Sequence, residues 1–337
     1  MPATAVRVIP PGPRPDRLGR LLRPGVADGH GRLSLPGFLR NHPLTSFFLL
    51  AFAIAWAILI PNVLASYGLI TMPASAVLLL VMGYGPTIAA LIVSGALGGG
   101  TEIRRLLGRL LIWRVGWGWW AITLFGNGAI ILAALGLYAL LGNEVPAFPA
   151  LGPGLLVDIV LTFLLVAVIN GEEIGWRGFA LPRLQARYGV PTTVAVLGVL
   201  ETLFHLPIFF NNGPSDAGGQ NGTPFVAFLF SSVLAVFLFV WLYDHTRGSL
   251  LIATFFHASM NAWSNVLPFP ATSASFFWLL VLAQLAAVAV VLVIGGTGWM
   301  QVRPGGANRL AAVEGLAGPT VLPWLACRID WTDGSRL

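Results

Sequence analysis

Three short segments of this 337-residue chain carry ionisable and amide side chains inside otherwise apolar stretches. An ionisable group in a membrane span costs roughly 2.5–3.5 kcal/mol on insertion scales, so such groups persist where they pair or perform chemistry. Together the segments supply carboxylates, two imidazoles and carboxamides, which suit activation of water and stabilisation of an oxyanion. The segments are NGEEIGWRGF, with Asn170, Glu172, Glu173 and Arg177; ETLFHLPIFF, with Glu201 and His205; and FFHASMNAWSN, with His257, Asn261 and Asn265.

Helical spacing separates the two adjacent carboxylates of the first segment. Residues four apart share a helix face, whereas neighbours point about 100° apart. We therefore expect Glu173 to pair with Arg177 and Glu172 to face another side, where an apolar environment favours a general base. The alternative for Glu172 is a carboxylate at a helix end that faces water.

The two histidines stand on helices with further polar groups on the same face. Glu201 is four residues before His205, and Pro207 after it breaks or kinks the helix and frees backbone groups. His257, Asn261 and Asn265 follow one another at four-residue steps, so they form a polar stripe that lines a helix contact or a cavity. A histidine in a span also fits a purely structural role, bonded to a backbone carbonyl.

Two chemistries use this set of side chains. In the first, Glu172, His205 and His257 bind Zn²⁺ or another divalent metal, since carboxylate and imidazole are suitable ligands. In the second, Glu172 and His205 activate water directly, while His257 and Asn261 donate hydrogen bonds to the tetrahedral intermediate. The sequence contains no HExxH motif, and the spacing leaves both chemistries open.

The composition places these segments in a membrane protein, because 56% of the residues are hydrophobic and 9% are charged. We predict an all-α, polytopic membrane helical bundle with about eight transmembrane helices, each near the ~20 residues that a span requires. The single cysteine, Cys327, excludes a disulfide framework. The predicted spans are 45–66, 73–97, 116–141, 153–173, 191–210, 225–243, 249–267 and 276–296.

The basic residues agree with this count. All 19 are arginines, and with a cytoplasmic N-terminus every one falls on the cytoplasmic side, as do both termini. We predict a disordered basic tail over 1–43, a transmembrane domain over 44–297 and a cytoplasmic C-terminal tail over 298–337. The basic segment 101–113 predicts a short helix in the cytoplasmic interface. Arginine without lysine is typical of GC-rich bacterial genes, so we expect a multi-pass protein of the bacterial inner membrane, with lipid and not nucleic acid as its partner.

One conflict of depth arises in this scheme. Glu172 lies at the cytoplasmic end of the fourth predicted span, whereas His205 lies about fifteen residues into the fifth. If the two cooperate, the fourth helix is immersed more deeply than its hydropathy indicates, or the fifth begins in the cytosol.

At these residues the sequence resembles the CPBP family of CAAX proteases and bacteriocin-processing enzymes, also called Abi. That family is marked by EExxxR, FxxxH and HxxxN motifs. Glu172, Glu173 and Arg177 match the first motif, His205 the invariant part of the second, and His257 with Asn261 the third. The stretch 83–100 and the basic segment after it also resemble bacterial members.

The resemblance implies an intramembrane endopeptidase related to the type II CAAX prenyl protease. Glu172 is then the catalytic glutamate, with His205, His257 and Asn261 as its active-site partners, while Glu173 and Arg177 organise the site. The chain departs from the family at Glu201, where an aromatic residue is usual, so an extra carboxylate could join the site.

The implied reaction is hydrolysis of a peptide bond near the cytoplasmic side of the membrane. The substrate is a peptide or protein, with a lipidated or membrane-embedded substrate among the alternatives. Two other functions stay open: a proton-coupled transporter that relays protons through Glu172, Glu173 and the histidines, and a catalytically silent immunity or scaffold protein. The sequence shows no repeated halves of the kind that secondary transporters usually have.

Overall fold

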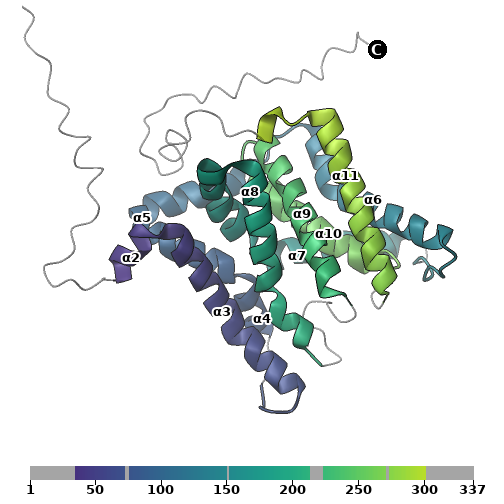
Figure 1. Cartoon of the computed structure of the whole chain (residues 1–337), viewed down its shortest axis with the longest axis horizontal. Coiled ribbons are helices and arrows are strands. Elements are labelled where there is room, and N and C mark those ends of the chain that lie inside the picture. The colour runs from purple at the N-terminus through teal and green to yellow at the C-terminus, as the bar shows by residue number, and fades with distance from the viewer. Residues whose placement is uncertain (1–34, 73–75, 150–151, 213–222, 271–272, 301–337) are drawn as a thin grey trace, which may run out of the picture.

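The computed structural model is helical throughout the part of the chain that it describes, which comprises residues 35–72, 76–149, 152–212, 223–270 and 273–300. Figure 1 shows a bundle in which α3 and α5 form one side, α6 and α11 the other, and α8, α9 and α10 lie between. The predicted all-α membrane bundle is thus confirmed. The elements are α2 (Leu35–Asn41), α3 (Pro43–Ser66), α4 (Ala76–Gly83), α5 (Gly85–Gly108), η1 (Arg109–Leu111), α6 (Trp117–Leu140), α7 (Pro153–Ile169), η2 (Ile174–Ala180), α8 (Leu181–Phe204), η3 (Leu206–Phe210), α9 (Phe225–His245), α10 (Leu250–Val266), α11 (Ala274–Gly295) and η4 (Gly298–Met300).

The helices occur at the predicted places, but fewer of them satisfy the requirements of a membrane span. Within the described ranges, five are long and apolar enough, and α7 together with Ile174–Phe204, bent by 53°, makes a sixth if the pair is one span. The predicted number of eight is therefore not established. Helix α10 is not among the helices that qualify, because it has only 17 residues and its polar stripe lowers its hydropathy. The five are α3, Gly85–Leu111, α6, α9 and α11.

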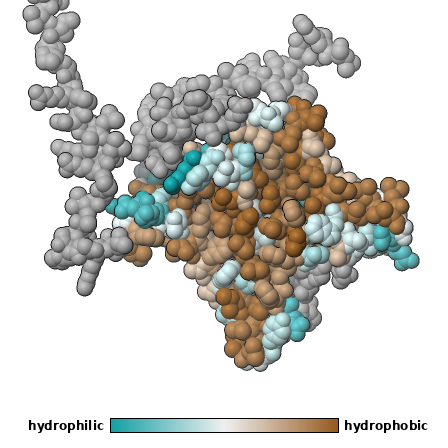
Figure 2. Space-filling view, in the orientation of Figure 1, coloured by the Kyte–Doolittle hydropathy of each residue, from teal (hydrophilic) through white to brown (hydrophobic). Residues whose placement is uncertain are grey.

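Apolar side chains cover much of the outer surface, as expected where lipid replaces water as the solvent (Figure 2). Helix α7 exposes Leu156, Leu161, Leu165 and Val168, each by more than half of its surface. A soluble domain rarely exposes such contiguous apolar surface. The outer face is therefore suited to contact with hydrocarbon.

The expected tails and the basic helix fall partly within the described residues. Residues 35–41, inside the expected N-terminal tail, form α2, and Gly298–Met300, at the start of the expected C-terminal tail, form η4. Residues 1–34 and 301–337 lie outside the described residues. The predicted short basic helix is present as the last part of α5, because Gly98 and Gly99 interrupt the helix before it. Leu106 on this part is buried in the core.

The chain folds back on itself within α8. A straight helix at 1.5 Å per residue would place Arg177 and Glu201 about 36 Å apart, yet their side chains meet at 2.9 Å. The return occurs at Gly189, whose φ of 76° lies in the left-handed region that glycine adopts without strain. Residues 174–188 therefore form a packed helical segment, where the span count implied a loop.

This fold-back resolves the conflict of depth between Glu172 and His205. The two residues lie on antiparallel segments on either side of Gly189, and this brings His205 Nε2 to 3.9 Å from Glu172 Oε1. The helix that contains the predicted fifth span begins at Leu181, before residue 191.

Close backbone contact holds the start of this segment against α5. η2 is a π-helix, a rare form that is frequent at functional sites. A Cβ atom added at Gly175 would lie 2.5 Å from the backbone of Pro86, and one added at Gly171 would meet the ring of Tyr84. Glycine at these positions lets the two segments approach.

We predict that Gly175→Ala lowers the free energy of unfolding by about 1–3 kcal/mol, because the new methyl group overlaps backbone atoms that cannot move aside. Equilibrium unfolding in detergent micelles measures the change. The matched control is Gly136→Ala in the exposed part of α6, where an added Cβ meets nothing within 4 Å and helix propensity favours alanine. Equal stability of the two variants would contradict the tight contact.

Candidate functional site

Glu172 occupies the break between α7 and the π-helix. Helix α7 ends at Ile169, and the carbonyl of Glu172 then accepts hydrogen bonds from the backbone N–H groups of Gly175 and Trp176. The side chain is 10% exposed, and its Oε2 accepts a hydrogen bond of 3.1 Å from the indole of Trp176. Its other oxygen is turned toward His205.

His205 ends α8 and presents one ring nitrogen to Glu172. Its Nδ1 lies 2.7 Å from the backbone carbonyl of Glu201, and a carbonyl can only accept, so Nδ1 carries the proton. In the neutral ring Nε2 is then an acceptor, and it lies 3.9 Å from Glu172 Oε1. This separation is too long for a direct hydrogen bond but allows one water molecule to bond to both atoms.

The second carboxylate of the pair serves the other histidine. His257 Nδ1 lies 2.7 Å from Glu173 Oε1, so this nitrogen donates to the carboxylate and the ring orientation is fixed. The sequence motifs group His257 with Glu172 and His205. The contact that the structure provides is instead with Glu173, because Glu173 and Glu172 point to different sides of their segment.

Arg177 joins the two antiparallel segments. Its Nε lies 3.2 Å from Glu173 Oε2 and its Nη1 lies 2.9 Å from Glu201 Oε2. The guanidinium also packs 3.7 Å from the ring centroid of Phe239. The predicted pair of Glu173 and Arg177 is present, and Glu201, the candidate extra carboxylate, is bound by the same arginine.

The side chain of Asn261 makes no hydrogen bond with the residues that the structure describes. Asn261 is one helical turn beyond His257 on α10, and its backbone carbonyl accepts a hydrogen bond of 2.8 Å from Asn265. Its carboxamide is therefore not committed to another protein group. No hydrogen bond joins it to Glu172 or His205 in the structure.

Several residues that position the site were not singled out from the sequence. Asn127, a lone amide within the apolar helix α6, donates to the Phe256 carbonyl at 3.0 Å and to Ser259 at 2.8 Å, which fixes α10. The hydroxyl groups of Thr87 and Tyr84 donate to the carbonyls of Gly171 and Val168. The sequence feature that could have identified these residues is a polar side chain within an otherwise apolar helix.

A metal centre is not assembled from these side chains. In the described parts of the chain, no three His, Cys, Asp or Glu residues form a group that could hold a metal ion. Glu172 and His205 face one another, while Nδ1 of His257 donates to Glu173, so only Nε2 of that ring is left as a ligand atom. Glu172, His205 and His257 are thus not gathered into a three-ligand group in the described residues.

Comparison with known proteins relates this segment to a family of membrane proteases. Residues 152–263, which contain all the candidate site residues, match the family model described as type II CAAX prenyl endopeptidase Rce1-like. The chain is also 29% identical over 137 residues to CAAX prenyl protease 2 of Methanococcus maripaludis, which covers 40% of this chain and 51% of that protein. The chain thus spans about half the length of that relative. The resemblance predicted from the three motifs is thus confirmed for residues 152–263.

We predict that Arg177→Ala lowers the free energy of unfolding by about 3–5 kcal/mol, because it leaves two carboxylates without their buried cation. Unfolding of the purified protein in detergent measures the loss. Arg104→Ala, at an exposed position of α5, is the matched control and should change the stability little. Normal stability of the Arg177 variant would show that the ion pairs contribute nothing to the fold.

Proposed function

We propose that this chain, whose residues 152–263 are Rce1-like, is an intramembrane endopeptidase that hydrolyses a peptide bond with water activated by Glu172 and His205. The observation that carries the proposal is the 3.9 Å separation of Glu172 Oε1 and His205 Nε2, two acceptors on a buried face of a membrane bundle. A water molecule that donates one hydrogen to each acceptor directs a lone pair away from both. That lone pair is available for attack on a carbonyl carbon.

In the proposed reaction, the water oxygen forms a bond to the carbonyl carbon while Glu172 takes a proton from the water. Glu172 then delivers this proton to the amide nitrogen as the C–N bond breaks, so the products are a carboxyl group and an amine. Trp176 restricts the carboxylate to one orientation through its hydrogen bond to Oε2. No step requires a metal ion, in keeping with the donor arrangement.

His257 and Asn261 are proposed to stabilise the negative oxygen of the tetrahedral intermediate. Glu173 accepts a hydrogen bond from Nδ1 of His257, and this neighbouring carboxylate favours the imidazolium form, in which Nε2 also carries a proton and can donate. The carboxamide of Asn261, one turn along the same helix, is uncommitted. Arg177 keeps Glu173 in place and is a positioning residue.

An apolar groove next to His205 supports a substrate that carries an apolar group. The groove lies between α3 and η3, has a volume of about 250 Å³, and is lined by aliphatic and aromatic side chains. Leu206, Pro207 and Phe210 follow His205 directly in the chain. A lipidated or membrane-embedded peptide placed in this groove would present its backbone near the proposed water. The other lining residues are Trp56, Ile60, Val63 and Leu64.

The setting of the enzyme is part of the proposal. Residues 44–297 are proposed to form the membrane protease domain, between cytoplasmic segments over 1–43 and 298–337. The membrane is proposed to be the bacterial inner membrane, with cleavage near its cytoplasmic side.

We predict that Glu172→Gln reduces peptide cleavage by at least about 10²–10⁴-fold, because the amide keeps the volume but cannot accept the proton. The full chain in lipid nanodiscs is incubated with a library of soluble and lipidated peptides, and mass spectrometry detects the products. Glu144→Gln, at an exposed acid after α6, is the control and should cleave normally. Failure of the wild-type chain to cleave any peptide, or full activity of the Glu172 variant, would refute the proposal.

A chelator should leave the rate of cleavage unchanged, because only Glu172 and His205 face the proposed water and a catalytic zinc site uses three protein ligands. The assay compares initial rates with and without the chelator, and a soluble zinc protease in the same buffer confirms that the chelator acts. Loss of activity that added Zn²⁺ restores would establish a metal-assisted reaction instead.

A further inference from the structure

The proposed reaction gives no task to Glu201, a carboxylate one helical turn before His205 at the end of α8. Its side chain is 13% exposed, and Oε2 accepts a hydrogen bond of 2.9 Å from Nη1 of Arg177. The other oxygen, Oε1, is buried and accepts no hydrogen bond from the described residues. A buried acceptor without a donor lowers stability, so a gain in stability is a poor reason for a carboxylate at this position.

One nitrogen of Arg177 is shared between two carboxylates. Nη1 lies 2.9 Å from Glu201 Oε2 and 3.3 Å from Glu173 Oε1. The first separation is typical of an N–H···O hydrogen bond, whereas the second lies just beyond the usual range of about 2.7–3.2 Å. The bond from Nη1 to Glu201 is therefore the stronger of the two.

The oxygen of Glu173 that Nη1 approaches is the oxygen that binds His257. Oε1 of Glu173 accepts the proton of His257 Nδ1 at 2.7 Å, while Oε2 lies 3.2 Å from Arg177 Nε. Two donors, Nη1 and Nδ1, thus compete for Oε1. Because a guanidinium is always charged, closer approach of Nη1 to Oε1 would weaken the bond to the imidazole.

We infer that Glu201 is a positioning residue, whose carboxylate draws Nη1 of Arg177 away from Glu173 Oε1 and keeps this oxygen available to His257. The inference rests on the proposed function, in which His257 stabilises the negative oxygen of the intermediate. Without the charge of Glu201, Nη1 moves toward Glu173 and the hydrogen bond that orients the imidazole weakens. A ring that is less firmly oriented stabilises the transition state less well.

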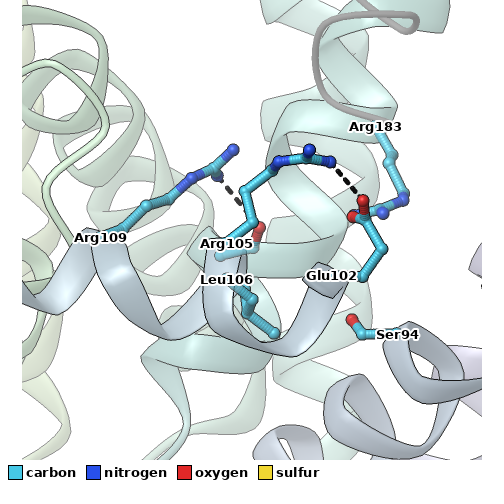
Figure 3. Close-up of a pocket in the computed structure, with 7 residues that line it drawn as sticks. Ser94, Glu102, Arg105, Leu106, Arg109 and Arg183 are labelled. Atoms are coloured by element: carbon cyan, nitrogen blue, oxygen red, sulfur yellow. Dashed lines mark hydrogen bonds and ion pairs between the residues drawn. The ribbon is translucent and has the colours of Figure 1, made fainter. Parts of the chain in front are cut away.

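The backbone that carries Arg177 is held without Glu201. Nη1 of Arg109, the first residue of η1, donates to the carbonyl of Gly178, which follows Arg177, at 3.2 Å (Figure 3). The ring of Phe239 also packs against the guanidinium, with its centroid 3.7 Å from Cζ. Loss of the charge at Glu201 is therefore expected to change the contacts of Nη1 and to leave the fold in place.

Glu201→Gln is the main test, because glutamine keeps the length of the side chain and removes its charge. A neutral acceptor forms a weaker hydrogen bond with arginine than a carboxylate does. Glu201→Asp keeps the charge on a shorter side chain and provides the test if the first variant does not fold. The control, Glu102→Gln, removes a carboxylate from another arginine pair, that of Glu102 with Arg105 on α5. Equilibrium unfolding in detergent verifies that each variant retains the fold.

The first measurement does not depend on cleavage. Nuclear magnetic resonance of the full chain with isotope-labelled histidine detects the Nδ1 proton of His257, which is assigned by its loss in His257→Gln. His245, whose Nδ1 lies 2.8 Å from the carbonyl of Trp241, serves as the internal reference. The second measurement is kcat and KM for a peptide that the wild type cleaves in nanodiscs.

We expect Glu201→Gln to move the His257 proton signal toward that of a weaker hydrogen bond. It should also lower kcat on the order of tenfold at unchanged KM, because the lost interaction acts in the transition state. Glu201→Asp should show smaller changes in the same direction, and Glu102→Gln should show none.

An unmoved His257 signal in a folded Glu201 variant, or an equal movement in Glu102→Gln, would overturn the inference whether or not any peptide is cleaved. A moved signal with unchanged kcat would overturn it as well, since Glu201 would then not affect the reaction. A wild type that cleaves no peptide would refute the proposed function, and the His257 signal would still decide whether Glu201 acts on the imidazole.

Discussion

The structure depends on the burial of one guanidinium between two carboxylates. Arg177 and Glu173 are almost completely inaccessible to solvent, and Glu201 approaches from the opposite segment. Ions removed from water require partners, so the two antiparallel segments can pack closely only while this group stays intact. The turn at Gly189 permits the chain to fold back. The contacts of Arg177 with Glu173 and Glu201 then fix which residues of the two antiparallel segments lie opposite one another.

This arrangement gives the adjacent glutamates different environments. Glu173 is committed to Arg177 and to Nδ1 of His257. The carboxylate of Glu172, among the described residues, accepts a hydrogen bond from the Trp176 indole alone and faces Nε2 of His205 across 3.9 Å. One carboxylate therefore contributes to positioning, and the other retains an oxygen for a water molecule. The difference follows from backbone direction, because consecutive residues of a helical segment cannot face the same partner.

The sequence was sufficient for the features that depend on local spacing. Four-residue spacing predicted the pair of Glu173 and Arg177, and the apolar runs predicted where helices occur. It did not reveal the fold-back, since the arginine distribution assigned Arg177 and Arg183 to a cytoplasmic loop. The rule that arginine marks cytoplasmic loops takes no account of what each arginine contacts. Both of these arginines are buried against the ring of an aromatic residue. The contact of His257 with Glu173 depends on the packing of α10, which no local pattern specifies.

The approach of Glu172 to His205 is also a consequence of packing at glycine positions. The Thr87 hydroxyl bonds to the Gly171 carbonyl, and Gly175 lies against the backbone of Pro86, so α5 supports the chain on both sides of Glu172. The π-helix that follows begins directly after the two glutamates. A larger side chain at either glycine would push this segment away from α5. The distance between Glu172 and His205 would then change by an amount comparable with the width of one methyl group. After such a change, one water molecule could no longer bond to both side chains.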